Sequence, residues 1–155
     1  SDRFDLALGM ARIEVKASGT RERRHRFSME QCVPDPGTKA FIASTLVHET
    51  SNGTSVRELA ERVQGLVKAD AELVMKVQRS LFSVMGLPRS GEPTFDEAHA
   101  LTKLSWYDAE DIPAIRSAPK HVDQVRYRID LEVAGALTVE EVISRAPCIE
   151  PCLPH

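Results

Sequence analysis

Cysteine and aromatic residues are scarce in this chain. It has three cysteines among 155 residues, and so small and odd a number argues against a secreted scaffold held together by disulfides. Aromatic side chains make up 5% of the sequence, which leaves little for the base stacking that single-stranded nucleic acid needs. We therefore expect a protein of a reducing compartment, most simply the cytoplasm.

Long apolar runs and a strong net charge are also missing. No stretch approaches the roughly 18 apolar residues of a membrane span, and the opening "SDRFDLALGM" lacks the basic and apolar regions of a signal peptide. The formal charge is −3, so nucleic acid would need a local basic patch rather than the field of the whole molecule. The sequence contains neither a glycine-rich phosphate loop nor a nucleophile beside a base. It therefore indicates no membrane partner and names no reaction.

What is present is the composition of an ordinary globular domain. Hydrophobic residues make up 42% of the chain and charged residues 28%, close to the averages for soluble proteins. A chain of this length can bury a core of its own. We expect a single domain over residues 1–146, followed by a tail over residues 147–155 that is rich in proline, cysteine and histidine.

Alternating apolar residues predict strands at both ends of the domain. From Leu6 to Val15 the alternation slips once, as in a strand with a bulge. Gly19 marks a turn and residues 21–29 alternate again, so these segments predict an amino-terminal hairpin. Residues 40–49 favour a further strand because they are β-branched and apolar. Residues 122–134 alternate most regularly and predict a late strand that returns to the hairpin.

Three apolar segments of helical period follow a capping box, in which a Ser or Thr and a Glu three residues later satisfy free amides at a helix start. The pairs are Ser55 with Glu58, Thr94 with Glu97, and Thr138 with Glu141. Asp70 is placed to cap a further helix that ends near Gly86. Strands and helices are thus segregated along the chain. The order predicts an α+β fold, in which a small antiparallel sheet, made of the amino-terminal hairpin and the strand at 122–134, is covered by three to four helices.

The tail carries a pattern of metal ligands. Cys148, Cys152 and His155 are spaced four and three residues apart, and thiolate and imidazole are the ligands that zinc and copper prefer. We predict a metal site at these residues, with zinc favoured and with copper, iron or nickel open. A fourth ligand would come from Cys32, His121 or Glu150. One alternative is a pair of partly buried thiols that act as small hydrophobic groups, and another is a disulfide or redox pair of cysteines.

Arginine is concentrated in the stretch "RERRHR". Its members are Arg21, Arg23, Arg24 and Arg26, and Arg126 and Arg128 lie on the late strand. Guanidinium groups match phosphate geometry, so this stretch predicts a surface that binds nucleic acid or phosphate. The alternative is a solvated face of salt bridges, since acidic residues are interleaved with the arginines.

Together these features favour a small accessory or binding protein, working with a protein partner or as a homo-oligomer, that holds a metal ion in its tail. One alternative is a regulator that binds nucleic acid through the arginine-rich hairpin. The pair of helices expected from residue 56 onward resembles a helix-turn-helix and offers a second route to the same function. Another alternative is an enzyme whose site forms in an oligomer.

Overall fold

The computed structural model describes residues 3–85 and 91–153, without the side chains of residues 84, 85, 151 and 152. It has small sheets and helices rather than one repeating βα unit, which confirms the predicted α+β class. The strands are β1 (Leu6–Leu8), β2 (Ala11–Ser18), β3 (Arg24–Ser28), β4 (Lys39–Leu46), β5 (Glu49–Ser55), β6 (Thr94–Phe95), β7 (Ser105–Asp108) and β8 (Arg126–Asp130). The α-helices are α1 (Val56–Leu66), α2 (Ala71–Met85), α3 (Glu97–Thr102) and α4 (Val139–Arg145), and short 3₁₀ helices are η1 (Met29–Cys32), η2 (Leu131–Val133) and η3 (Pro147–Cys152).

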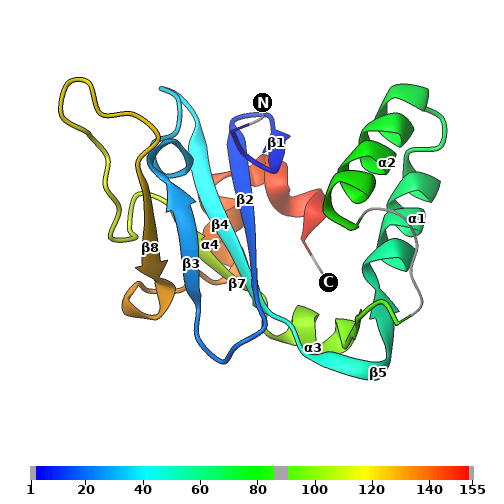
Figure 1. The fold of residues 1–155 in the computed structure, drawn as a ribbon. Coiled ribbons are helices and arrows are strands. Elements are labelled where there is room, and N and C mark those ends of the chain that lie inside the picture. The colour runs from blue at the N-terminus through cyan, green and yellow to red at the C-terminus, as the bar shows by residue number, and fades with distance from the viewer. Residues whose placement is uncertain (1–2, 86–90, 154–155) are drawn as a thin grey trace. The chain divides into compact units, whose positions relative to one another are not determined.

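The chain divides into two compact units, one made of Ser1–Val47 with His99–His155 and the other of His48–Ala98. In the first unit, a sheet has the strand order β1-β2-β4-β7, in which only β2 and β4 are parallel. Strands β3 and β8 form a separate antiparallel pair, and Figure 1 shows them side by side. The second unit contains α1, α2 and the pair of β5 with β6.

Both faces of the four-stranded sheet are covered. Ile42 on β4 packs toward the β3-β8 pair, where Phe27 and Ile129 are buried. Phe41, the neighbour of Ile42, points to the other face because successive strand residues alternate, and it packs with Val142 of α4. The first unit is therefore layered, with the β3-β8 pair on one face of the sheet and α4 with η3 on the other.

The pairing of the amino-terminal hairpin differs from the sequence-based expectation. The chain turns at Gly9, whose φ of +54° lies in the left-handed region that glycine adopts without strain. As a result β1 pairs with β2, and the supposed bulge is a tight turn between two strands. The other edge of β2 is occupied along its whole length by β4. Strand β3 therefore pairs with β8 instead of β2, which confirms the predicted return of the late strand to the 21–29 segment.

Two of the three predicted capping boxes are confirmed, those of Ser55 with Glu58 and of Thr138 with Glu141. Asp70 also caps α2, since its Oδ1 accepts the N–H groups of residues 72 and 73 at 3.0 and 3.1 Å. The box at Thr94 was wrong. Thr94 is held in an extended conformation by its pairing with Ser55 in the β5-β6 ladder, and its hydroxyl donates to the carbonyl of residue 50. The predicted end of α2 near Gly86 lies outside the described residues.

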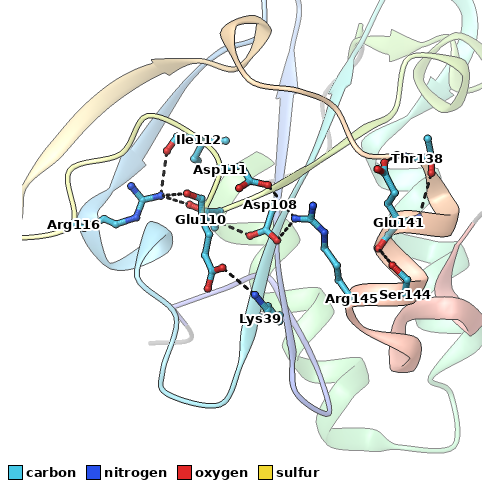
Figure 2. A network of polar contacts seen from close by, with 11 residues as sticks. Lys39, Asp108, Glu110, Asp111, Ile112, Arg116, Thr138, Glu141, Ser144 and Arg145 are labelled. Atoms are coloured by element: carbon cyan, nitrogen blue, oxygen red, sulfur yellow. Dashed lines mark hydrogen bonds and ion pairs between the residues drawn. The ribbon is translucent and has the colours of Figure 1, made fainter.

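A polar network connects the end of β7 with α4 (Figure 2). Asp108 is 1% exposed, and Arg145 Nη1 lies 2.6 Å from its Oδ2 and 3.0 Å from Asp111 Oδ2. Lys39 at the start of β4 pairs with Glu110 at 3.0 Å. These contacts join segments that are far apart in the sequence. Among the helices of residues 3–85 and 91–153, none is both long and apolar enough to cross a membrane.

Candidate active site

An acidic residue and a lysine lie on the same face of β2. Glu14 and Lys16 are two residues apart, so both side chains point to one side of the strand. Their partners across β2-β4 are Ile42 and Ser44, on the face that the β3-β8 pair covers. Lys16 Nζ donates to Glu14 Oε1 at 2.6 Å, and the two side chains are 17% and 5% exposed. Glu14 is therefore a nearly buried carboxylate with an ammonium group beside it.

A second carboxylate comes from the residue before β1. Asp5 is exposed, and its Oδ2 accepts the backbone N–H of Val15 at 2.8 Å. This bond holds Asp5 beside β2 at Val15, the residue between Glu14 and Lys16 in the sequence. Asp5 is also close enough for its charge to act on Glu14. Asp5 is thus held beside β2 where β1 begins, and it is the second carboxylate near Glu14 and Lys16.

Burial dominates the electrostatics of Glu14. Desolvation raises its pKa above the ordinary value of 4.5, the hydrogen bond and charge of Lys16 oppose this rise, and the charge of Asp5 adds to it. A carboxylate that is costly to ionise in the free protein gains most when a cation is bound beside it. The site is therefore set up to respond strongly to positive charge.

Residues of β3 and η1 hold Glu14 and Lys16 in place. Gln31 Nε2 donates to Glu14 Oε1 at 2.5 Å, and Gln31 Oε1 accepts the backbone N–H of Ser28 at 2.9 Å. Lys16 Nζ lies 5.0 Å from the centroid of the Phe27 ring, within the range of a cation–π contact. The β3-β8 layer therefore orients both charged side chains.

A buried histidine lies beside this site. His25 Nε2 is 2.8 Å from Ser44 Oγ, and Arg23 Nη1 donates to the carbonyl of Ser44 at 2.7 Å. Burial first, and then the charges of Lys16 and Arg23, lower the pKa of His25. A neutral imidazole at this position adds no further positive charge to Lys16.

The two carboxylates suit a hard divalent cation. Within the described part of the chain, neither Asp5 Oδ1 nor Glu14 Oε2 accepts a hydrogen bond, so each side chain keeps an oxygen for another ligand. Mg²⁺ is usually held by one or two carboxylates together with water and substrate phosphates. The described residues contain no cluster of three or more His, Cys, Asp or Glu side chains arranged for a metal, and the donor set of Asp5 and Glu14 fits an ion that substrate and water help to hold.

The arginines of "RERRHR", predicted to form one phosphate-binding surface, lie on different faces because successive residues of a strand point to opposite sides. Arg21 is exposed before β3, whereas Arg23 is 9% exposed and its Nη2 donates to the carbonyl of Lys103 at 2.5 Å. Arg24 pairs with Asp130 at 3.2 Å. Arg26 is exposed and lines a pocket with Arg126 and Arg128. The structure thus brings Arg26 together with the late strand and places Arg23 in the interior.

The tail of the chain is attached to the core. Ile149 and Leu153 are buried against the sheet, while Cys148 is exposed and its Sγ lies 3.1 Å from the carbonyl oxygen of Leu8. The side chain of Cys152 and the whole of His155 lie outside the described residues. The metal site predicted at Cys148, Cys152 and His155 therefore stays a prediction.

The three candidates for the fourth ligand of that site lie in different parts of the structure. Cys32 is buried in the core beneath β3 and β8, where desolvation raises the pKa of its thiol. His121 adopts a positive φ of 68° in the connection before β8, and Glu150 is exposed on η3. The choice among them stays open.

A family described as "Putative PD-(D/E)XK family member, (DUF4420)" matches residues 1–132. The chain belongs to this family. The match includes Asp5 and all of β1, β2 and β3, and therefore the whole site described above. The motif PD-(D/E)XK is a proline and an aspartate followed later by an acidic residue, any residue and a lysine, and Glu14, Val15 and Lys16 match its second part. Asp5 is the upstream acidic residue, and Phe4 stands before it where the name has proline.

No curated protein and no solved structure matches the chain.

Asp5, Glu14 and Lys16 were not predicted as a site from the sequence. A signal was available, because an acid and a lysine two residues apart in a strand share a face. The upstream aspartate could be connected with them only through the tight turn at Gly9.

Proposed function

We propose that Asp5, Glu14 and Lys16 form the active site of a divalent-metal-dependent enzyme that hydrolyses phosphodiester bonds of nucleic acid. The observation that carries the proposal is the 2.6 Å contact of Lys16 with the nearly buried carboxylate of Glu14, beside Asp5, in a chain of the PD-(D/E)XK family. This arrangement combines acidic oxygens for a cation with an ammonium group for the reacting phosphate.

Each residue has a role that follows from its chemistry. Asp5 and Glu14 would hold Mg²⁺ or Mn²⁺ through carboxylate oxygens that accept no hydrogen bond from the described residues. Such an ion, when bound, stabilises negative charge on a phosphoryl oxygen and lowers the pKa of water. Lys16 stabilises the charge that develops when water attacks phosphorus. Gln31 keeps the Glu14 carboxylate oriented toward the site.

The reaction is the addition of water across one P–O ester bond. The water oxygen forms a bond to phosphorus and the ester P–O bond breaks, which leaves a phosphate monoester and a free hydroxyl. One proton of the water passes to solvent or a nearby base, and the departing oxygen takes up a proton. No oxidant or reductant is needed, which agrees with a site made of carboxylates and an amine.

The test is an assay for cleavage of plasmid and linear DNA and of RNA with Mg²⁺ or Mn²⁺ and, in parallel, with a chelator. We expect metal-dependent cleavage that Lys16→Met lowers by at least about a hundredfold, since a charge-stabilising group contributes about that much. Lys103→Met, a change of another lysine in the same unit, should retain activity. Equal cleavage by the Lys16→Met protein and the unchanged protein would overturn the assignment.

The other sequence-based proposals concern different parts of the chain. An accessory role with a protein partner or in a homo-oligomer is compatible with a nuclease and stays a proposal, as does a cytoplasmic location. The metal site in the tail, with zinc, copper, iron or nickel as its ion, is tested by elemental analysis of anaerobically purified protein beside a Cys148→Ser, Cys152→Ser variant. A content of zinc, copper, iron and nickel that is the same in this variant as in the unchanged protein would exclude a site at these cysteines.

A further inference from the structure

Three arginines gather on the outer face of the β3-β8 pair. Arg26 lies directly opposite Arg128, and Arg126 lies opposite Ser28. Residues opposite each other in an antiparallel pair, and residues two apart on one strand, point to the same face. Arg26, Arg126 and Arg128 are all exposed, whereas Phe27 between them in the ladder is buried on the other face. The register therefore concentrates positive charge in a small area.

This charge is poorly balanced within the protein. Like charges directly opposite each other destabilise a sheet, yet within the described residues no ion pair joins Arg26 or Arg128 to a carboxylate. The nearby carboxylate is Glu30. Its own backbone N–H first, and then Ser28 and the charges of Arg3 and Arg126, lower the pKa of Glu30. One shared carboxylate leaves the Arg26 and Arg128 pair without a counterion.

Arg24 shows the contrast on the same face. It lies two residues before Arg26 and opposite Asp130, and its guanidinium contacts Asp130 at 3.2 Å and Glu22 at 3.5 Å. One end of this face is thus an ordinary salt-bridged surface. The other end keeps its arginines available for an external anion.

The uncompensated end borders a pocket that shares one side chain, Gln31, with the contacts of the candidate active site. The pocket has a volume of about 620 Å³ and is lined by Arg26, Phe27, Ser28, Gln31, Arg126, Tyr127 and Arg128. Gln31 is shared, because its amide also donates to Glu14 at 2.5 Å. A molecule in this pocket would therefore contact Gln31, the side chain that also holds Glu14.

We propose that this arginine pocket, defined by Arg26, Arg126 and Arg128, binds a backbone phosphate of the nucleic acid next to the phosphodiester held at Glu14 and Lys16. The inference rests on the proposed function for the identity of the ligand as substrate. Guanidinium groups bind phosphate through paired hydrogen bonds, and a polynucleotide is an anion that can reach the pocket and the carboxylate site at once. The pocket positions substrate and takes no part in bond breaking.

The experiment measures binding of a short fluorescein-labelled duplex DNA by anisotropy in metal-free buffer with chelator, over a series of salt concentrations. The double variant Arg26→Gln, Arg128→Gln should bind at least about tenfold more weakly. Its plot of log affinity against log salt should flatten by about 0.9, because each neutralised phosphate contributes about 0.9 to the slope and the pocket holds one phosphate. Arg24→Gln, the matched control on the same face, should change affinity by less than about twofold, since that arginine is already paired.

A second variant and a competitor make each outcome decisive. Glu14→Gln, which removes a proposed metal ligand and no phosphate contact, should keep DNA affinity in chelator while losing cleavage. A failed cleavage assay of the unchanged protein with these arginine effects intact would reject the nuclease and leave the pocket standing. Inorganic phosphate and a mononucleotide at constant ionic strength should displace the DNA only weakly. Full displacement by either would overturn the proposal in favour of a small-anion site.

Equal loss of DNA affinity in Arg24→Gln and in the double variant would show a diffuse charge effect and would also overturn the proposal. Circular dichroism of each variant checks that the fold is retained.

Discussion

At the scale of single residues, Glu14 shows a conflict between folding and function. The carboxylate is nearly buried and its pKa is raised chiefly by desolvation, so its ionisation at neutral pH weakens the free protein. Ionisation is also what a cation at this position needs. Residues that lower the stability of the folded protein are concentrated at active sites, and the buried carboxylate of Glu14 is such a residue.

This conflict predicts a pH-dependent gain in stability for Glu14→Gln. A carboxyl group whose pKa is higher in the folded state contributes its full stability below the unfolded pKa and loses it as the pH rises through the folded pKa. The glutamine keeps the acceptor oxygen for Lys16 but has no charge to desolvate. In chelator, the free energy of unfolding of Glu14→Gln relative to the unchanged protein should therefore increase from acidic to neutral pH. A difference that stays constant with pH in denaturant titrations would contradict the desolvation of Glu14.

The arginines show how far single residues could be assigned from the sequence. Alternation placed Arg23 and His25 on one face of the strand and Arg24 and Arg26 on the other, and the structure agrees. Which face is internal depended on the partner layer, which is distant in the sequence. Arg23 is satisfied by the carbonyls of Ser44 and Lys103, contacts that no local pattern could reveal.

At the scale of elements, local signals predicted helix starts well and strand partners less well. The capping boxes at Ser55 and Thr138 depend only on residues within one turn. The partner of β2 is β4, which runs parallel to it, and a parallel pair requires a long connection that leaves no short-range pattern. Asp5 could be connected with Glu14 and Lys16 only once β1 was placed against β2.

The contact between α4 and β7 predicts a loss of stability in Arg145→Met. This change removes the partner of Asp108, which is 1% exposed and held at 2.6 Å, and leaves a buried carboxylate with fewer contacts (Figure 2). We expect the free energy of unfolding to fall by about 1 to 2 kcal/mol, less than for a fully buried pair because Arg145 is partly exposed. The exposed Lys120→Met is the control. An equally small effect for both variants in urea titrations would show that the pair at Asp108 does not hold α4 in place.

At the scale of the whole molecule, the candidate site draws on distant segments of one unit. One carboxylate is that of Asp5, and β2 supplies the other carboxylate and the lysine. Gln31 lies on η1, and β8, far later in the sequence, adds two arginines. The composition and net charge could exclude a generally basic nucleic-acid coat but could not reveal a local patch. The predicted α+β class is confirmed, whereas the site depended on long-range pairing and on the family to which residues 1–132 belong.

The most direct test of the central claim compares cleavage and binding of the same DNA by Glu14→Gln and by Glu22→Gln, an exposed acid before β3. We predict that Glu14→Gln loses at least about a hundredfold in the metal-dependent cleavage rate and keeps the affinity for DNA measured in chelator, while Glu22→Gln keeps both. Mg²⁺ or Mn²⁺ should also raise the thermal midpoint of the unchanged protein and not that of Glu14→Gln. Undiminished cleavage by Glu14→Gln would contradict the assignment of this site.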